Sequence, residues 1–419
     1  MISTPKYLGP DIKTILAEKG LDSDGRLWRG RLEGTSGRDV ERALASATGS
    51  YSLEKLLAFI SPAAEDYLEE MAQLARQLTV QRFGRTIRLY APLYLSNSCV
   101  NSCRYCGFNR ENKFKRTRLT IEQALTEADI IAAEGFRDIL LVSSEDRKIV
   151  SIEYLTELAK KLRSKFSSIS IEVYQMSVAE YAKLFEAGIK GVTVYQETYD
   201  RQAYAYYHPA GPPKAGMIRP SGAGPKSDYD NRLDTPDRVA AAGMREIGLG
   251  VLLGLADWRV ETLALAEHAH YLVKRYWRSR VSFSFPRLRP AYSRLQTSDH
   301  LSLGSCHLLS DKNLVQMIMA LRLCFADAGL VLSTRERAEL RDRLIKLGTT
   351  KMSAGSKTCP GGYSEQTDAP PKTGMIRAGV AGRQFEIDDS RSPAQVAAMI
   401  RAQGAEPVWK DWDSAFSED

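Results

Sequence analysis

Residues 87–108 of the chain read IRLYAPLYLSNSCVNSCRYCGF. The first part of this stretch, Ile87–Leu95, is apolar and short enough to be a buried β-strand. Three cysteines follow it directly. Cys99, Cys103 and Cys106 have the spacing C-x3-C-x2-C, and a loop of this size lets three thiolates converge on one small metal cluster. We therefore predict a strand that ends in a metal-binding cysteine loop.

Further strand-like runs follow along the chain, most of them separated by amphipathic helical patterns. They are residues 138–142, 169–174, 191–195, 246–253, 281–285, 330–333 and, more weakly, 350–353. The helical pattern 119–135 opens with Thr120 and Gln123 arranged as a capping box. Eight strands alternating with helices over roughly 270 residues predict an α/β fold, a (β/α)8 TIM-type barrel, with a doubly wound open sheet as the alternative.

The pattern changes on both sides of the predicted barrel. Residues 1–85 read as an N-terminal helical extension, with an apolar helical face over 53–60 that Pro62 ends. The barrel occupies 86–365, with an inserted loop at about 210–226, and 366–419 form a C-terminal segment with a Gly/Pro-rich loop and a short helical tail. Residues 212–219 recur almost verbatim as 370–377. We interpret both copies as surface loops.

The bulk composition is that of a globular protein. The 419 residues are 43% hydrophobic and 26% charged, and a net charge of +7 is mild for this length. The densest basic run, 113–118, is too short to predict a nucleic-acid interface, and we interpret it as a solvated loop. No run of eighteen apolar residues predicts a membrane span, and the first residues lack the apolar core of a secretory signal. We expect a cytoplasmic location.

The cysteine loop predicts a specific chemistry. Four-iron clusters usually take four thiolates, but no fourth cysteine or histidine is close in sequence. One iron would then be open to S-adenosylmethionine (SAM), which can chelate it through its amino and carboxylate groups. An electron from the cluster would break the sulfonium–C5′ bond and release a 5′-deoxyadenosyl radical. Structural zinc, which wants four ligands, and three unrelated buried cysteines are the alternatives.

The cysteine spacing resembles that of the radical SAM superfamily, and the wider signature 93–108 is similar to its aromatic amino-acid lyase branch. Further matches run from about residue 40 to the end, outside the two repeated loops. They are 194–199, 247–255, 285–290, 332–336, 353–357, 360–363 and 407–413. Together these stretches resemble the family of 2-iminoacetate synthases, the tyrosine lyases of thiamine biosynthesis.

The resemblance implies a full barrel with a 4Fe-4S cluster, SAM and substrate at its C-terminal mouth. It implies cleavage of L-tyrosine at the Cα–Cβ bond to 2-iminoacetate (dehydroglycine) and p-cresol, with methionine and 5′-deoxyadenosine formed. The radical would take a hydrogen from the amino group of the substrate, and the side chain would depart as a 4-hydroxybenzyl radical. A thiazole synthase and a flavodoxin- or ferredoxin-type electron donor are the implied partners.

Cofactor contacts follow from the same resemblance. Cys99, Cys103 and Cys106 would bind the cluster. The superfamily places a small, Gly-rich, acid-containing turn after the second strand, where this chain has Ser143-Ser144-Glu145. Glu145 would hydrogen-bond the methionyl ammonium, although relatives more often have glycine in place of Ser144. The other candidates follow the third, fourth and sixth strands: Glu172, for which an ordinary salt bridge is the alternative, Gln196, Glu197 and Arg287.

The substrate contacts are expected at three strand ends. Arg335 ends the seventh strand, and its planar fork suits bidentate binding of the substrate carboxylate. An ion pair with Glu336 or Asp342 is the alternative. Ser353 could add a hydrogen bond, and Tyr94 is placed near the reacting end of the substrate.

Two related enzymes and one other class of protein remain as alternatives. The hydrogenase-maturation tyrosine lyase shares barrel and substrate but carries a second cluster bound by cysteines in a C-terminal extension, whereas this chain has only Cys359 after Ser356. A tryptophan lyase of the same branch differs in pocket shape. A non-catalytic iron–sulfur or zinc-binding protein would have no iron open to SAM.

Overall fold

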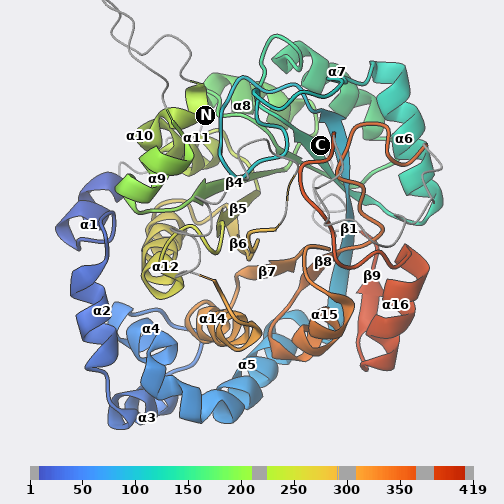
Figure 1. Ribbon diagram of the computed structural model, residues 1–419. Coiled ribbons are helices and arrows are strands. Elements are labelled where there is room, and N and C mark those ends of the chain that lie inside the picture. The colour runs from blue at the N-terminus through green and yellow to red at the C-terminus, as the bar shows by residue number, and fades with distance from the viewer. Residues whose placement is uncertain (1–8, 210–223, 290, 292–307, 365–381, 411–419) are drawn as a thin grey trace, which may run out of the picture.

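Strand β1 (Thr86–Ser96) pairs in parallel with both β2 and β8, and this double pairing closes the sheet into a barrel (Figure 1). The computed structural model describes residues 9–209, 224–289, 291, 308–364 and 382–410. From β2 the strands follow one another around the ring in chain order, all in parallel. They are β2 (Asp138–Ser143), β3 (Ser168–Glu172), β4 (Gly191–Glu197), β5 (Glu246–Val251), β6 (Arg280–Ser284), β7 (Gly329–Leu332) and β8 (Lys351–Ser353). The predicted eight-stranded barrel is confirmed, and the open sheet is wrong.

Helices surround the barrel on its outside (Figure 1). Those that connect or follow the strands are α6 (Ile121–Ala133), α7 (Ile152–Leu162), α8 (Val178–Glu186), α11 (Thr235–Ala241), α12 (Trp258–Arg275), α14 (Asp311–Cys324), α15 (Ala338–Leu344) and α16 (Pro393–Ala402). Short helices α9 (Arg201–Tyr207), η2 (Pro225–Ser227) and α10 (Tyr229–Leu233) lie between β4 and α11, and η4 (Ile345–Leu347) precedes β8. The predicted capping box of Thr120 and Gln123 opens α6.

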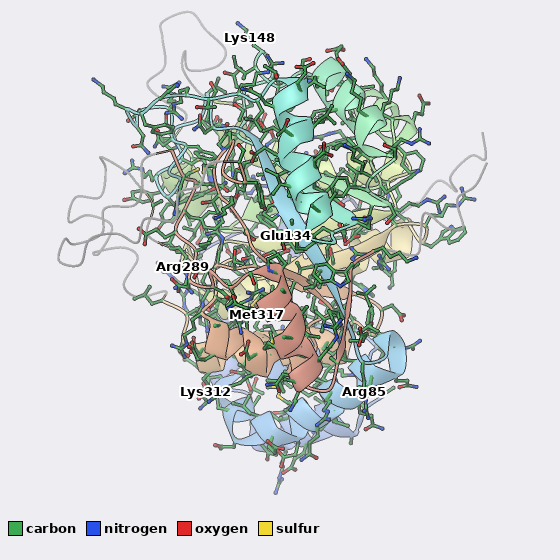
Figure 2. All side chains as sticks on the ribbon, turned by 90° about the vertical axis from the view of Figure 1, so that its right-hand side faces the viewer. Arg85, Glu134, Lys148, Arg289, Lys312 and Met317 are labelled. Carbon is green, nitrogen blue, oxygen red and sulfur yellow. The ribbon has the colours of Figure 1, made fainter. Side chains whose placement is uncertain are left out.

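The N-terminal helices form an additional layer against one side of the barrel. They are α1 (Ile12–Glu18), α2 (Arg26–Glu33), α3 (Gly37–Ala45), α4 (Leu53–Ile60), η1 (Pro62–Tyr67) and α5 (Leu68–Phe83). Helices α4 and α5 pack against α14, and their apolar side chains belong to the same core as the barrel. Figure 2 shows this layer at one end of the molecule and Lys148, which precedes α7, at the other.

The C-terminal segment adds a strand that the sequence pattern did not predict. Strand β9 (Glu406–Val408) pairs with the first residues of β1, from Thr86 to Arg88. It lies on the same edge of β1 that pairs with β2 from Ala91 onward. The predicted boundaries at 85 and 365 stay predictions, as does the inserted loop at 210–226, whose repeat copy 212–219 lies outside the described residues together with 370–377. None of the helices described is long and apolar enough to cross a membrane.

Charged side chains are buried at the end of the barrel where the strands begin. Arg88 of β1 contacts Asp138 of β2 at 2.9 Å and Glu246 of β5 at 2.8 Å, and Lys351 of β8 contacts Asp138 at 3.0 Å. Asp138 is fully buried. Burial of these charges is tolerated because each is paired across the barrel.

Removing one member of this network should destabilise the fold. Asp138→Ala leaves two buried cations with one carboxylate fewer, and we expect a loss of about 3–5 kcal/mol in the free energy of unfolding. Urea denaturation of the apoprotein measures it. Asp129→Ala, which removes an exposed partner of Lys165, is the control and should cost less than about 1 kcal/mol. Equal effects of the two substitutions would contradict the network's role.

Candidate active site at the barrel mouth

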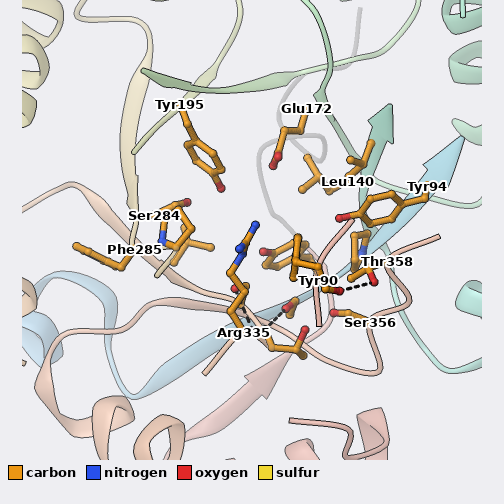
Figure 3. A pocket seen from close by; sticks show the side chains of 18 residues that line it. Tyr90, Tyr94, Leu140, Glu172, Tyr195, Ser284, Phe285, Arg335, Ser356 and Thr358 are labelled. Carbon is orange, nitrogen blue, oxygen red and sulfur yellow. Dashed lines mark hydrogen bonds between the residues drawn. The ribbon is translucent and has the colours of Figure 1, made fainter. Parts of the chain in front are cut away.

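Two adjoining cavities open at the carboxyl ends of the strands. The inner cavity, about 560 Å³, lies within the barrel and is lined by residues that include Tyr90, Tyr94, Ser284, Ser353 and Phe385 (Figure 3). The cysteine cavity, about 790 Å³, is lined by residues that include Cys99, Cys103, Cys106, Ser143, Ser144, Glu145, Glu197, Lys226, Arg232 and Gln384. Both volumes include space that is open to solvent. Five residues line both cavities: Val142, Glu172, Tyr195, Pro286 and Arg335.

The cysteine loop is held by hydrogen bonds rather than by regular structure. Arg116 holds the loop in place, because its guanidinium donates hydrogen bonds to four backbone oxygens within and beside the loop. These are the oxygens of Asn97 (2.7 Å), Phe108 (2.9 Å), Asn109 (2.6 Å) and Asn112 (3.0 Å). The interpretation of 113–118 as a purely solvated loop is therefore wrong at Arg116, and no pattern in the sequence marks this role.

The three thiols fit a cluster in their chemistry and placement. Burial raises the pKa of Cys106 to about 11 and raises the pKa of Cys99 and Cys103 as well, so metal binding must displace their protons. In a four-iron cluster each thiolate binds a different iron atom, which requires thiols around a common cavity. Within the described ranges, no three His, Cys, Asp or Glu side chains are grouped to hold a single metal ion.

The turn after β2 lies against the cysteine loop. Asn101 donates a 2.8 Å hydrogen bond to Glu145, and the backbone oxygen of Glu145 accepts from the Val100 N–H at 3.0 Å. The Ser144 hydroxyl lies within 2.5 Å of the Ser98 oxygen and 3.1 Å of the Ser96 oxygen. The Ser144 hydroxyl thus connects the turn to the cysteine loop.

A buried pair of opposite charges occupies the end of β4. Glu197 accepts from the Lys226 ammonium at 2.6 Å and lies 3.8 Å from Arg232. Burial opposes ionisation of Glu197, but the two cations lower its pKa overall. Glu197 has φ of 71°, the only positive value among described non-glycine residues. Sequence reasoning missed Lys226 and Arg232, since the helices that carry them, η2 and α10, are too short to show a periodic pattern.

Glu172 is the carboxylate that faces both cavities. Burial raises its pKa to about 7, and the nearby charge of Glu197 adds to the rise, while Arg335 opposes it. No salt bridge of Glu172 occurs among the described residues, so the alternative of an ordinary ion pair does not account for it.

Two of the predicted cofactor contacts lie elsewhere. Gln196 is buried but lines neither cavity, because successive side chains of a strand alternate and its neighbours Tyr195 and Glu197 face inward. Arg287 lines neither cavity, and its guanidinium contacts Glu336 and, at 2.9 Å, Asp311. The structure therefore does not support either residue as a cofactor contact.

The three predicted substrate contacts come together in the inner cavity. Figure 3 shows the Arg335 side chain extending into it toward Tyr195 and Glu172. The Ser353 hydroxyl accepts from the Thr334 N–H at 3.1 Å. Neither Glu336 nor Asp342 pairs with Arg335; Glu336 contacts Arg287 and Arg289, and Asp342 contacts Arg391.

Known proteins match this chain along most of its length. Residues 93–266 match the Radical SAM superfamily, and residues 284–406 match the Biotin and Thiamin Synthesis associated domain. The chain is 43% identical to 2-iminoacetate synthase of Salmonella typhimurium and 42% identical to that of Escherichia coli, in each case over 92% of this chain and 93% of the relative. The crystal structure of HydG, a maturase of the FeFe-hydrogenase, superimposes with a TM-score of 0.81 at 30% identity, covering 94% of this chain and 82% of that one.

The chain forms a parallel barrel with three cysteines in the loop after its first strand, and residues 93–266 match the Radical SAM superfamily. These features define a radical SAM enzyme. Such an enzyme acts as a catalyst rather than as an electron carrier or a zinc protein. The near-complete coverage at 43% identity shows that the chain belongs to the 2-iminoacetate synthase family of carbon–carbon lyases.

The raised pKa of Glu172 predicts a pH-dependent stability. In the folded apoprotein Glu172 keeps its proton up to about pH 7, whereas the unfolded chain loses it near the ordinary value of 4.5. This contribution to stability is therefore fully present below pH 4.5 and is lost as the pH rises through 7. Glu172→Gln should gain stability relative to the wild type between pH 5 and 8 in urea denaturation. Glu186→Gln, on the surface of α8, is the control for the substitution. A difference in unfolding free energy between Glu172→Gln and the wild type that stays constant with pH would contradict the raised pKa of Glu172.

Proposed function

We propose that the two adjoining cavities cleave the Cα–Cβ bond of L-tyrosine to 2-iminoacetate and p-cresol. The observation that carries the proposal is the shared wall. Glu172, Tyr195 and Arg335 face both the cavity with the cysteines and the cavity with the substrate contacts. A carbon radical generated in the cysteine cavity would therefore lie next to a substrate bound in the inner cavity. The names of the relatives support the choice of product.

Cys99, Cys103 and Cys106 would hold a 4Fe-4S cluster. With SAM bound, this cluster would supply a 5′-deoxyadenosyl radical, and 5′-deoxyadenosine and methionine would be formed. The protein's part is to hold the cofactor in one orientation and to keep water out of the cavity.

Carboxylates of the cysteine cavity would orient the cofactor. Glu145 is buried and already accepts from Asn101, so it is suited to accept from the methionyl ammonium as well. Glu172 is placed for the ribose or the amino group. Lys226 and Arg232 keep Glu197 ionised in the same cavity, and Ser143 and Ser144 shape the turn that carries Glu145.

The inner cavity would bind the amino acid by its carboxylate. Arg335 offers N–H donors in a plane, which matches a carboxylate in bidentate fashion. Ser353 adds a hydroxyl, and Tyr94 lies beside the reacting end. Held this way, the substrate presents its amino group toward the cysteine cavity, where hydrogen abstraction would start and the 4-hydroxybenzyl side chain would leave.

The reaction implies two partner proteins. Each reductive cleavage needs one electron, for which we propose a flavodoxin- or ferredoxin-type donor. The 2-iminoacetate product hydrolyses in water, and we propose that a thiazole synthase consumes it in the cytoplasm.

The products separate this function from its nearest alternatives. Anaerobic reconstitution with iron, sulfide, dithionite, SAM and tyrosine should give p-cresol together with glyoxylate, the hydrolysis product of 2-iminoacetate. Cyanide and carbon monoxide in place of glyoxylate, with p-cresol still formed, would indicate hydrogenase-maturation chemistry. An indole product from added tryptophan would indicate a tryptophan lyase.

Loss of a cluster ligand should stop the first chemical step. Cys103→Ala should abolish formation of 5′-deoxyadenosine and reduce bound iron, because only two thiolates of the loop remain. Cys324→Ala is the matched control, since Cys324 is buried in α14 away from both cavities, and it should retain activity. Cleavage of SAM by Cys103→Ala would refute the ligand assignment.

Exchange of the guanidinium should weaken substrate binding. Arg335→Lys keeps the charge but loses the planar fork, and we expect a cost of roughly 1.5–3 kcal/mol in tyrosine binding. Isothermal titration of the reconstituted, SAM-bound enzyme with tyrosine measures this. Arg337→Lys, on the exposed side of the same loop, is the control. Unchanged tyrosine affinity in Arg335→Lys would reject the assignment.

A further inference from the structure

A segment near the C-terminus crosses from the cysteine loop to the loop after β7. We call Gly382–Asp389 the strap. Its backbone is anchored on both sides: the Gly107 N–H donates to the Gln384 oxygen at 3.0 Å, and the N–H groups of Asp388 and Asp389 donate to the Thr334 oxygen at 3.0 and 3.1 Å. Between these anchors the strap borders both cavities.

Further bonds fix the middle and the end of the strap. The Gln384 N–H donates to the Thr358 oxygen at 3.0 Å, and the Thr358 hydroxyl donates to the Phe385 oxygen at 3.0 Å. Asp389 forms a fully buried ion pair with Arg341 of α15. The strap is thus held by hydrogen bonds to the loops after β7 and β8 and by an ion pair to α15.

The strap also approaches the cysteine loop more closely than a side chain would allow. A Cβ atom added at Gly107 would lie 2.4 Å from the Arg383 oxygen and 2.8 Å from the Gln384 oxygen. Only glycine therefore fits at position 107 beside the strap, and this close contact fixes the position of the strap against the cysteine loop.

Two side chains of the strap reach the site. The Gln384 side chain accepts a 2.6 Å hydrogen bond from the Tyr94 hydroxyl. The ring of Phe385 lies with its centroid 3.3 Å from the Arg335 guanidinium carbon. A guanidinium that stacks on an aromatic face keeps its N–H donors directed outward in its own plane.

Arg335 has few other contacts that could fix its plane. Among the described residues no carboxylate lies within salt-bridge distance of it, since its candidate partners are bound to Arg287, Arg289 and Arg391. Within the part of the chain that the structure describes, the one hydrogen bond of the Arg335 guanidinium is a 3.4 Å contact with the Arg287 oxygen, which is too long to hold a flexible side chain firmly. The Phe385 ring is the close contact that remains.

We propose that Phe385 is a positioning residue for substrate binding, whose ring sets the plane of the Arg335 guanidinium for the carboxylate of the amino-acid substrate. The inference rests on the proposed function, because it takes Arg335 as the carboxylate contact. Phe385 itself acts through Arg335, and the strap holds the ring at a fixed distance from both the cysteine loop and the end of β7.

The test compares four variants of the reconstituted holoenzyme: Phe385→Leu, Phe385→Tyr, Arg335→Lys and the double variant Phe385→Leu/Arg335→Lys. Leucine keeps an apolar side chain without a ring, and tyrosine keeps the ring. We expect Phe385→Leu to raise KM for tyrosine about 5- to 30-fold with kcat within about threefold. Phe385→Tyr should stay within about twofold of the wild type. Iron content per chain verifies that each variant is folded and loaded.

The double variant separates an effect through Arg335 from a general packing effect. If Phe385 acts through the guanidinium, Phe385→Leu should change KM less than about twofold once Arg335 is lysine. An equal loss in both backgrounds, or a KM for Phe385→Leu within twofold of the wild type, would overturn the inference. An Arg335→Lys variant with unchanged tyrosine affinity would instead remove the proposed carboxylate contact and, with it, this role for Phe385.

Discussion

The parallel pairing of β1 with β2 on one edge and with β8 on the other is the constraint on which the site depends. Because side chains alternate along each strand and all strands end at one mouth, closure brings strand ends from distant parts of the sequence around one space. The loop after β1 then faces the loops after β7 and β8. In this arrangement two cavities share a common wall.

Buried charge is distributed differently at the two ends of the barrel. Where the strands begin, Arg88, Asp138, Glu246 and Lys351 are matched among themselves, and such an arrangement stabilises a structure without binding anything. At the mouth, Arg335 has no carboxylate partner among the described residues, and Glu172 has a raised pKa. Buried groups that are incompletely matched in charge and line a cavity are typical of a site for charged ligands.

Most of the fold could be predicted from the sequence, because each barrel strand is a short apolar run and the runs alternate with helical periodicity. Strand β9 could not, since three residues carry no period. Glu172 and Arg335 were predicted as site residues from strand ends, and the structure places both beside the two cavities, Glu172 at the end of β3 and Arg335 in the loop after β7. Lys226 lies in the three-residue helix η2 and Phe385 in the strap. Neither segment has a periodic pattern, and nothing local indicates what it contacts across the fold. Arg287 shows the converse, since its position after β6 suggested a ligand contact and only the fold revealed its carboxylate partners.

The close approach of the strap to Gly107 has a consequence for biosynthesis. A ribosome delivers the cysteine loop about 280 residues before it delivers residue 384. Until then the amide beside Cys106 lacks its acceptor. The cysteine loop therefore reaches its final packing only after the strap has been synthesised and folded onto it. A chain that stopped directly before residue 382 would keep Cys99, Cys103 and Cys106 but would lack the backbone that packs against Gly107.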